Sequence, residues 1–252
     1  MIEIDAVSHR YGPQTVLDDV SLTLGDVGVT SVIGPNGAGK STLFSVIGRL
    51  VAPVAGRVVI DGSDAATAAP RDLARLIAVL RQDNHLTARL TVADLVEFGR
   101  FPHSRGRLGP DDRDAVDRAI AYLDLEPLRG RFLDELSGGQ RQRAFIAMVL
   151  AQDTRYVLLD EPLNNLDLKH AVEIMRLLRR MADELDKRVI VVLHDINFAS
   201  AHSDRIIAMR GGRVVADAAP ADIMRPELLA DLYELPVDVR EIDGRAVALY
   251  YA

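Results

Sequence analysis

The feature that most constrains the fold is a glycine-rich turn between a short apolar segment and a helix-forming one. Residues 34–41 read Gly-Pro-Asn-Gly-Ala-Gly-Lys-Ser, and Thr42 follows. This order matches the pattern G-x-x-x-x-G-K-[ST], in which backbone N–H groups cradle phosphate oxygens. The preceding run Val29–Ile33 predicts a buried strand, and the residues from about Lys40 to Leu50 predict a helix. Strand, loop and helix in this order indicate a nucleotide-binding α/β domain.

The residue types in this loop predict a role for each part of it. Glycines let successive N–H groups converge on phosphate oxygens where side chains would block the approach. The helix N-terminus adds a positive end. The Lys40 ammonium is expected to reach the β- and γ-phosphates, and the Ser41 hydroxyl to bind Mg²⁺. The predicted nucleotide contacts are Gly34, Pro35, Asn36, Gly37, Ala38, Gly39, Lys40, Ser41 and Thr42.

Composition removes several classes of function. The 252 residues include no cysteine, which excludes disulfides, zinc–thiolate sites, iron–sulfur clusters and thiol catalysis. With 30 Lys and Arg against 37 Asp and Glu the net charge is −7, which argues against a nucleic-acid partner and against direct docking on anionic lipid. No apolar run approaches the ~20 residues of a spanning helix, and the N-terminus lacks a signal-peptide layout. We therefore expect a protein that lies in, or faces, the cytosol.

The hydrophobic pattern predicts an α/β fold in one domain, residues 1–252. The opening alternates apolar and polar residues, as antiparallel strands do, and the end of the chain contains two hairpins, the last around Asp243-Gly244. Continuous apolar runs indicate parallel strands buried on both faces, at Leu76–Leu80, Tyr156–Leu159 and Val189–Leu193. A helix is expected at Leu168–Leu185. The core and antiparallel strands are assigned to about 1–86 and 153–252, and a helical subdomain to about 87–152.

A second glycine-containing turn precedes another helix. Leu136-Ser137-Gly138-Gly139-Gln140 leads into an amphipathic segment from Arg141 to Gln152. Ser137 suits an N-cap, but an ordinary capped helix does not explain two glycines, each of which costs about 1 kcal/mol in a helix. The chain thus has two helix N-termini suited to phosphate, on different parts of the molecule. One triphosphate fills the first, so we expect a head-to-tail homodimer in which each copy offers its second turn to the other's nucleotide.

The two turns together resemble the ATP-binding-cassette (ABC) ATPase family, and the resemblance covers essentially the whole chain. It implies a P-loop NTPase fold with a RecA-like parallel sheet core, an antiparallel β subdomain and a helical subdomain. It also implies ATP hydrolysis. Residues 136–140 correspond to the family's signature motif, which contacts the ATP of the partner subunit.

The same resemblance assigns the hydrolytic residues. Asp160 and Glu161 end an apolar strand, where adjacent side chains face opposite ways and so take different roles. Asp160 is expected to hold Mg²⁺ through water, and Glu161 to orient and deprotonate the attacking water. The remaining assignments are Gln82 to Mg²⁺ or the water, His194 to the γ-phosphate, Asn165 and Asp167 to a loop that crosses the dimer, and Tyr11 to the adenine ring. A tyrosine at that position could equally serve packing, and the role of Gln82 follows from the resemblance alone.

Two stretches, residues 90–103 and 163–170, resemble the ATPase subunits of iron–siderophore, haem and cobalamin importers. The first follows Gln82, where the family docks the coupling helix of the membrane subunit, although Phe101-Pro102-His103 read alone is an exposed turn. The resemblance implies a peripheral protein on the cytoplasmic face of the inner membrane. Its partners would be a polytopic permease and, indirectly, an extracytoplasmic substrate-binding protein.

Iron–siderophore import is the favoured function. Haem and cobalamin stay open as other cargoes, because no residue of the chain is expected to touch the cargo. The alternative from a different class is a soluble ABC-type ATPase that acts on a cytosolic assembly, for example in iron–sulfur cluster maturation. Co-purification with a polytopic membrane protein would separate the two. A GTPase is disfavoured because no N-K-x-D motif occurs.

Overall fold

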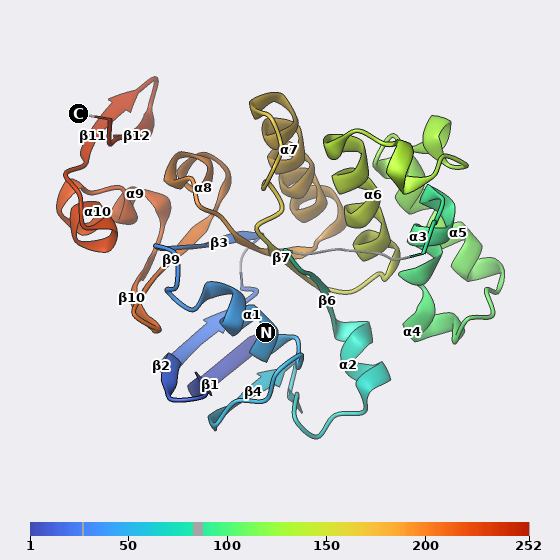
Figure 1. The fold of residues 1–252 in the computed structure, drawn as a ribbon, viewed down its shortest axis with the longest axis horizontal. Helices are drawn as coiled ribbons and strands as arrows, with labels where there is room; N and C mark the ends of the chain where they lie inside the picture. The colour runs from blue at the N-terminus through green and yellow to red at the C-terminus, as the bar shows by residue number, and fades with distance from the viewer. Residues whose placement is uncertain (27, 83–87, 252) are drawn as a thin grey trace.

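The computed structural model describes residues 1–26, 28–82 and 88–251, and its centre is a six-stranded sheet (Figure 1). Five of the strands are parallel, and β10 is antiparallel to its neighbour β9. In spatial order the strands are β10 (Arg213–Ala218), β9 (Arg205–Arg210), β3 (Val29–Ile33), β8 (Arg188–Val192), β7 (Tyr156–Asp160) and β6 (Ile77–Leu80). The prediction of a parallel α/β core is confirmed.

Alternate residues of the central strands feed two separate cores. In β7, Val157 and Leu159 belong to the core shared with the helices α6, α7 and α8, whereas Tyr156 and Leu158 belong to the core on the opposite face. Every residue of β7 is buried. Both faces of the sheet are therefore covered, which is why its strands are continuous apolar runs. The three helices are α6 (Gly138–Ala151), α7 (Leu168–Leu185) and α8 (Ile196–His202).

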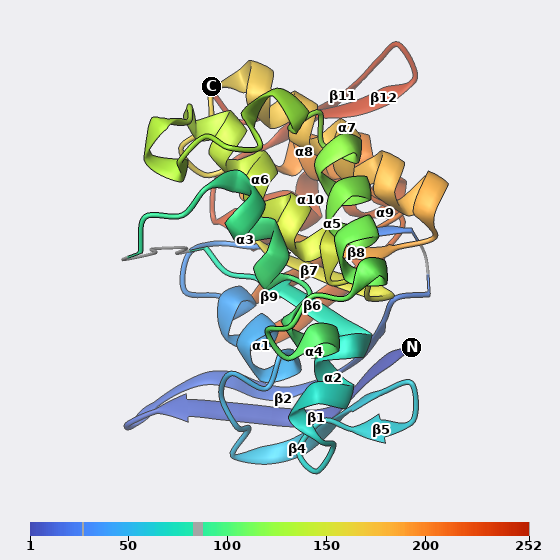
Figure 2. The same ribbon diagram turned by 90° about the vertical axis from the view of Figure 1, so that its right-hand side faces the viewer.

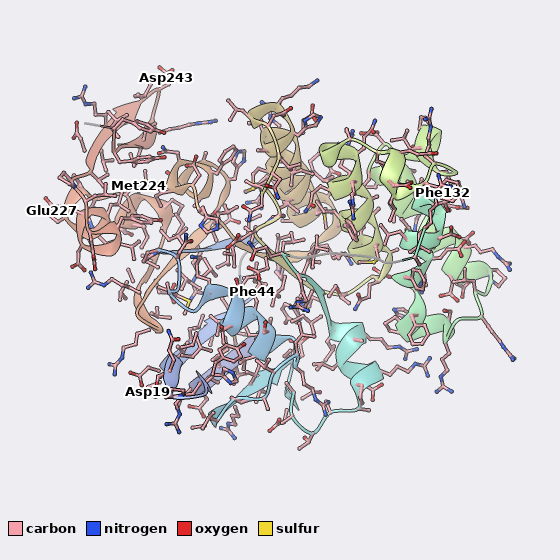
Figure 3. All side chains as sticks on the ribbon, in the orientation of Figure 1. Asp19, Phe44, Phe132, Met224, Glu227 and Asp243 are labelled. Carbon is pink, nitrogen blue, oxygen red and sulfur yellow. The ribbon has the colours of Figure 1, made fainter. Side chains whose placement is uncertain are left out.

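An antiparallel sheet covers the other face, with one helix between the two sheets (Figures 1 and 2). Its strands, in spatial order, are β2 (Gln14–Leu24), β1 (Ile2–Tyr11), β4 (Ala55–Ile60) and β5 (Ser63–Asp64). The helix between the sheets is α1 (Lys40–Ile47), whose Phe44 is 1% exposed and lies at the middle of the molecule (Figure 3). The predicted antiparallel strands at the start of the chain are thus confirmed, and they enclose the helix that follows the glycine-rich loop.

A helical segment lies between β6 and β7 and packs as one group (Figure 2). It contains α3 (Val92–Phe98), α4 (Phe101–Ser104), α5 (Pro110–Tyr122), two 3₁₀ turns at Glu126–Leu128 and Leu133–Glu135, and α6. The guanidinium group of Arg71, on α2 (Pro70–Leu76), donates to the carbonyls of Pro102 and His103 and so ties α4 to the core. The predicted boundary at 86/87 lies outside the described residues.

The C-terminal part closes against α8. After α9 (Pro220–Ile223) and α10 (Pro226–Tyr233), the hairpin β11 (Asp238–Ile242) and β12 (Arg245–Leu249) lies at the left of Figure 1. The side chain of Asn197 pairs with the backbone of Ala248, donating to its oxygen at 3.1 Å and accepting from its nitrogen at 2.8 Å. The predicted terminal hairpin is present, and it is attached to the helix that begins just after His194.

Several predicted element boundaries differ from the structure by one to three residues; the strand predicted at Val189–Leu193, for example, is Arg188–Val192. The first helix ends at Ile47 rather than Leu50, because Gly48 caps it and Arg49 turns the backbone to a φ of 56°. The strand predicted at Leu76–Leu80 starts one residue later, since Leu76 closes the unpredicted helix α2. The helix predicted to begin at Arg141 begins at Gly138, directly after its Ser137 cap.

Membrane-spanning helices were sought throughout the described ranges 1–26, 28–82 and 88–251. None of the helices there is both long enough and apolar enough to cross a bilayer.

The helical segment is fixed by a buried ion pair whose loss should destabilise the protein. Asp112, 9% exposed, accepts hydrogen bonds from Arg100 Nε and from Gly109 N, each at 3.0 Å. In Asp112→Asn the Arg100 guanidinium stays buried without its counter-charge, which should lower the free energy of unfolding by about 3 kcal/mol. Urea denaturation at pH 7 measures this loss.

The neighbouring Asp111 is exposed and gives a matched control, because Asp111→Asn should change the free energy of unfolding by less than about 0.5 kcal/mol. The hydrogen bond from Gly109, aided by Arg100, lowers the pKa of Asp112. Its stabilisation is therefore present at neutral pH and is lost as the pH falls below about 4. The gap between Asp112→Asn and the wild type should shrink over that range, and a gap that widens in acid would contradict the account.

Candidate functional site

The loop at residues 34–41 connects β3 to α1 and depends on two glycines. A Cβ atom on Gly34, whose φ is 143°, would lie 2.0 Å from the carbonyl oxygen of Met209. A Cβ atom on Gly39, whose φ is 98°, would lie 2.6 Å from the carbonyl oxygen of Val16. The neighbouring strands therefore press on the loop from outside, and they hold its backbone so that the N–H groups at the start of α1 open into a cavity of about 190 Å³.

Lys40 is the cation of this loop, and it is 4% exposed. Its Nζ donates to the carbonyl oxygens of Gly34 at 2.7 Å and Pro35 at 3.0 Å, which folds the side chain back over the loop. Burial lowers the pKa of Lys40, while the negative charges of Glu161 and Asp160 oppose that shift. An ammonium group placed here is aimed at an anion bound against the loop.

Ser41 and Asp160 form a pair of oxygen donors at the edge of the loop. The Ser41 hydroxyl donates to Asp160 Oδ1 at 3.0 Å, and Asp160 is 7% exposed at the end of β7. Burial raises the pKa of Asp160 to about 6, and the charge of Glu161 adds to the rise, whereas Ser41 and Lys40 oppose it. A divalent cation would restore the ionised form, and hydroxyl and carboxylate oxygens are the ligands that Mg²⁺ accepts alongside phosphate. The donor set therefore fits Mg²⁺ held jointly by protein and substrate.

Glu161 is the convergence point of three polar side chains. Its carboxylate accepts from Gln82 Nε2 at 2.8 Å and from the Asn164 amide, and His194 Nε2 lies 2.7 Å from its other oxygen. Gln82, Glu161 and His194 follow β6, β7 and β8, which are neighbours in the sheet. Because parallel strands end on the same edge, their carboxyl ends bring these groups together. The carboxylate is only 9% exposed and is held from two sides.

Glu161 lies outside its strand, which corrects the argument from strand alternation. β7 ends at Asp160, and Glu161 takes a φ of 51°, a conformation that few residues other than glycine adopt. This turn, rather than the pleat of the strand, directs its carboxylate toward Gln82 and His194. The conclusion that the two acids play different roles does not depend on alternation, because their partners differ.

The second glycine-containing turn forms a capping box. The Ser137 hydroxyl accepts from the backbone N–H of Gln140 at 3.3 Å, and the Gln140 side chain accepts from the Ser137 N–H at 3.0 Å. Leu136 packs partly against the core, while Ser137 and Gly138 are exposed and Gly139 is buried. The Ser137 N-cap is confirmed, and the exposed residues present the start of α6 to solvent.

Two cavities meet at Glu161. The first, of about 190 Å³, is bordered by the loop, by Val16 and by Glu161. The second, of about 320 Å³, is bordered by Arg81, Gln82, Gly138, Arg141, Gln142, Phe145, Asp160, Glu161, Asn164, Asn165 and Leu166. Within the described part of the chain, residues 136–140 do not border the first cavity. The two turns thus occupy separate cavities, as expected, but these cavities share one carboxylate within a single chain.

The segment that follows Glu161 joins these two turns. Asn165 has a φ of 62°, and Asp167 is the N-cap of α7, accepting from the backbone N–H of His170 at 2.9 Å. The hydrogen bond from His170 lowers the pKa of Asp167. Asn165 borders the second cavity together with Gly138. Asn165, one of the two residues predicted for a dimer loop, therefore lies beside the start of α6, whereas Asp167 contacts His170.

Some expected residues lie apart from the cavities, and others were missed. Tyr11 is 52% exposed at the end of β1, and its ring centroid lies 4.7 Å from that of His9 in a T-shaped arrangement. Among the described residues it borders neither cavity. Val16 borders the loop cavity, and Asn164 bonds to Glu161, yet neither had an assigned role. Asn164 lies three residues after Glu161, a spacing that a turn could have suggested; Val16 carries no sequence signal.

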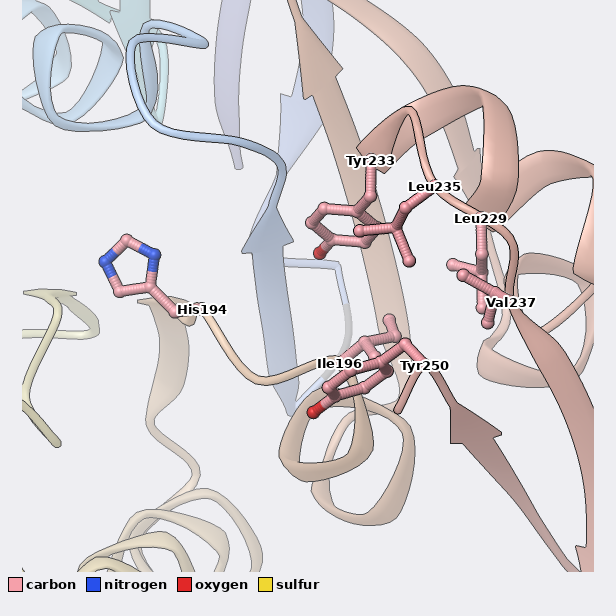
Figure 4. Close-up of a pocket in the computed structure, with 7 residues that line it drawn as sticks. All are labelled: His194, Ile196, Leu229, Tyr233, Leu235, Val237 and Tyr250. Atoms are coloured by element: carbon pink, nitrogen blue, oxygen red, sulfur yellow. The ribbon is translucent and has the colours of Figure 1, made fainter. Parts of the chain in front are cut away.

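An apolar cavity of about 190 Å³ lies behind His194, between α8, α10 and the C-terminal hairpin (Figure 4). Tyr233 and Tyr250 point into it, and His194 points the other way, toward Glu161. Burial raises the pKa of Tyr233 to about 12. Of the residues that line this cavity, His194 is the one that also contacts Glu161.

Comparison with known proteins identifies the family. A family profile described as ABC transporter matches residues 17–164, which include the loop, the capped turn, Gln82 and Glu161 but not His194. The petrobactin import ATP-binding protein YclP of Bacillus subtilis (strain 168) is 46% identical over 252 residues, covering all of both chains. The chain belongs to the ABC transporter family. It is an ATP-binding, ATP-hydrolysing member of that family.

Two further ABC proteins extend the comparison. The ferric enterobactin transport ATP-binding protein FepC of Escherichia coli (strain K12) is 40% identical over 227 residues, which are 89% of this chain and 84% of FepC. A dimeric structure of the ATP-binding cassette MJ0796, in a post-hydrolysis state with ADP and Pi, aligns with a TM-score of 0.76. The identity is 31%, with 87% of this chain and 99% of that chain covered. The predicted ABC ATPase fold is confirmed.

Removing the charge of Glu161 should separate ATP binding from hydrolysis. Glu161→Gln keeps the size of the side chain and leaves the loop intact, so ATP affinity by calorimetry should stay near the wild-type value. The rate of phosphate release should fall by about 10²–10⁴-fold, the usual contribution of a general base. Glu227→Gln, an exposed change on α10, is the matched control and should keep the wild-type rate. Near wild-type turnover in Glu161→Gln would show that another group accepts the proton.

Proposed function

We propose that this chain is the ATPase subunit of an iron–siderophore importer and that it works as a homodimer on a separate membrane permease. The observation that supports this is similarity to a petrobactin import ATP-binding protein over its full length, and to an enterobactin transport ATP-binding protein over 89% of this chain, combined with the cluster of Gln82 and His194 around Glu161. The parts of the chain act as follows.

The loop binds the triphosphate. Backbone N–H groups of residues 36–42 receive the phosphate oxygens, and the Lys40 ammonium moves from the Gly34 and Pro35 carbonyls to the β- and γ-phosphates. Tyr11 at the rim of the antiparallel sheet stacks on the adenine ring.

Mg²⁺ accompanies the nucleotide. Ser41 would hold the ion directly, Asp160 would hold it through water, and the Gln82 amide oxygen would be the further protein ligand, because the Gln82 nitrogen is already bonded to Glu161. The ion neutralises charge on the β- and γ-phosphates. Among the residues that the structure describes, no cluster of three or more His, Cys, Asp or Glu side chains could hold a metal alone, which agrees with a site completed by phosphate.

Glu161 is the general base. Gln82 and Asn164 fix one carboxylate oxygen and His194 meets the other, so that the carboxylate faces the cavity with little freedom of rotation. Because the carboxylate is already ordered, it can accept the proton of the attacking water without a further loss of conformational entropy. His194 leaves Glu161 for the γ-phosphate when nucleotide is bound, which links the state of the nucleotide to α8.

The capped turn at residues 136–140 serves the partner subunit. Ser137 and Gly138 are exposed at the N-terminus of α6, a site with a positive partial charge, and they do not border the loop cavity of their own chain. The solved MJ0796 cassette is a dimer with ADP and Pi. Head-to-tail pairing would place each turn, together with Asn165 and Asp167, against the γ-phosphate held by the other copy.

The permease docks on the helical subdomain, which we assign to about 87–152, with the core at about 1–86 and 153–252. Phe98 at the end of α3 and Phe101 at the start of α4 are 55% and 62% exposed, a pair of large apolar side chains left uncovered. The assembly would place the protein peripherally on the cytoplasmic face of the inner membrane. A substrate-binding protein would deliver the chelate from the other side, without contact to this chain.

Phe101 provides the test of coupling. The backbones of Pro102 and His103 bond to Arg71, and His103 Nε2 lies 2.9 Å from the oxygen of Gln152, so replacing the whole turn would damage the fold. Phe101→Ser removes only the exposed ring. ATP hydrolysis by the isolated subunit should stay at the wild-type rate, while ferric petrobactin uptake by cells that depend on this subunit should fall by about tenfold or more.

Ile242→Ser is the matched control, because Ile242 is 51% exposed on the C-terminal hairpin and should affect neither measurement. Tagged wild-type subunit should also bring down a polytopic membrane protein, and the Phe101→Ser variant should bring down less of it. Full uptake by Phe101→Ser, or a wild-type subunit that purifies without any membrane protein while supporting its cellular role, would contradict the proposal.

A further inference from the structure

The second glycine of the capped turn lies against the ring of His170. A Cβ atom on Gly139 would lie 2.3 Å from His170 Cδ2, 2.7 Å from Cγ and 3.1 Å from Nε2. Contacts of a Cβ atom below 3.0 Å are essentially never tolerated, so even alanine at this position would force a movement. The imidazole of α7 therefore contacts the backbone of α6 at its second residue.

The adjacent glycine has no such neighbour. A Cβ atom on Gly138 would meet only Leu166 Cδ2 at 3.7 Å and the oxygen of Asn165 at 3.8 Å, which are ordinary contacts. Both glycines lie in the regular turns of α6, where the backbone accepts any residue. Contacts within this chain therefore explain only one of the two glycines. At position 139 the His170 ring leaves no room for a Cβ atom, whereas at position 138 there is room for one.

The ring of His170 is itself held in place. Its Nδ1 lies 2.8 Å from Asp167 Oδ1, and the same oxygen accepts the backbone N–H of His170 at 2.9 Å. Asp167 caps α7, so the ring is tied to the rigid first turn of an 18-residue helix. To swing away from Gly139 the imidazole would have to break its bond to Asp167.

Together with two other contacts, the contact between His170 and Gly139 connects the Glu161 carboxylate to the capped turn through one short segment of the chain. The Asn164 amide donates to Glu161, Leu166 faces Gly138, and His170 faces Gly139. Residues 164–170 therefore touch Glu161 at one end and the N-terminus of α6 at the other. A movement of this segment has to be shared with the start of α6.

We propose that His170 is a positioning residue: held by Asp167, its imidazole is a fixed stop that sets where the N-terminus of α6 lies relative to the segment carrying Glu161. The proposal rests on the proposed function in one respect, because it assumes that this helix end acts in ATP hydrolysis. Residue 139 is a glycine because the His170 ring packs directly against its backbone. Through this contact, the position of the segment that carries Glu161 determines the position of the turn offered to the partner subunit.

A double-mutant cycle between Gly139 and His170 tests the stop. Gly139→Ala should lower kcat for ATP by about tenfold or more with little change in KM, because the new methyl group displaces the helix end. His170→Ala alone should lower kcat by several-fold, since the stop is gone. Gly139→Ala/His170→Ala should recover most of the loss of Gly139→Ala, because the methyl group then occupies the space of the ring.

Gly138→Ala is the control, and His170→Ala should bring it no recovery, because no ring atom lies at that position. Urea unfolding and ATP affinity of all variants show whether kcat changes in folded, nucleotide-binding protein. A double variant as slow as Gly139→Ala would overturn the proposal. So would a double variant that regains stability but not kcat, because His170 would then be a packing residue only.

Failure of this inference can be told from failure of the proposed function. If Glu161→Gln abolished turnover and the double-mutant cycle showed no coupling between Gly139 and His170, the hydrolytic role of Glu161 would be supported and the positioning role of His170 would be wrong. If Glu161→Gln and Gly139→Ala both left turnover unchanged, the assignment of the site would fall first.

Discussion

The structure depends on the parallel order of three neighbouring strands. β6, β7 and β8 end on one edge of the sheet, so Gln82, Glu161 and His194 meet there although 112 residues separate the first from the last in sequence. The covering layers keep this edge in register: helices on one face, and α1 with the antiparallel sheet on the other. The glycine-rich loop before α1 follows β3, which is the neighbour of β8 in the same sheet. The pairing of the strands thus brings the phosphate-binding loop and the residues around Glu161 to the same edge of the sheet, and the side-chain contacts fix their final positions.

Local signals were sufficient for much of this arrangement. Continuous apolar runs predicted the buried strands because burial on both faces leaves no alternation, and Leu168–Leu185 was predicted with both ends correct. Two assignments failed where a turn overrode the local pattern: Gly48 ended the first helix early, and Glu161 left its strand with a positive φ. The loop residues could be foreseen because their geometry is carried by consecutive residues. The bond of Asn164 to Glu161 spans only three residues, so a turn could have suggested it. His170 could not be foreseen, because its contact with Gly139 joins residues 31 positions apart in the sequence.

Buried charge ties the site together. Lys40 and Asp160 are both nearly inaccessible, burial shifts the pKa of each toward its neutral form, and each opposes the shift of the other. A nucleotide with Mg²⁺ would supply the missing counter-charges, so its binding should relieve a cost that the fold itself carries. Behind the site, Asn197 fastens α8 to the C-terminal hairpin and gives the backbone of His194 a rigid support. In the proposed function, one chain binds the nucleotide with its own loop, and hydrolysis would require the capped turn of a second copy.

Mixed dimers measure that central claim most directly. In the first, one subunit carries Lys40→Ala and the other Ser137→Arg; in the second, one subunit carries both changes and its partner is wild type. If each nucleotide lies between the loop of one copy and the turn of the other, the first dimer keeps one intact site and hydrolyses ATP, whereas the second keeps none. Activity in the second dimer and none in the first would mean that each chain completes its own site, and would contradict the account.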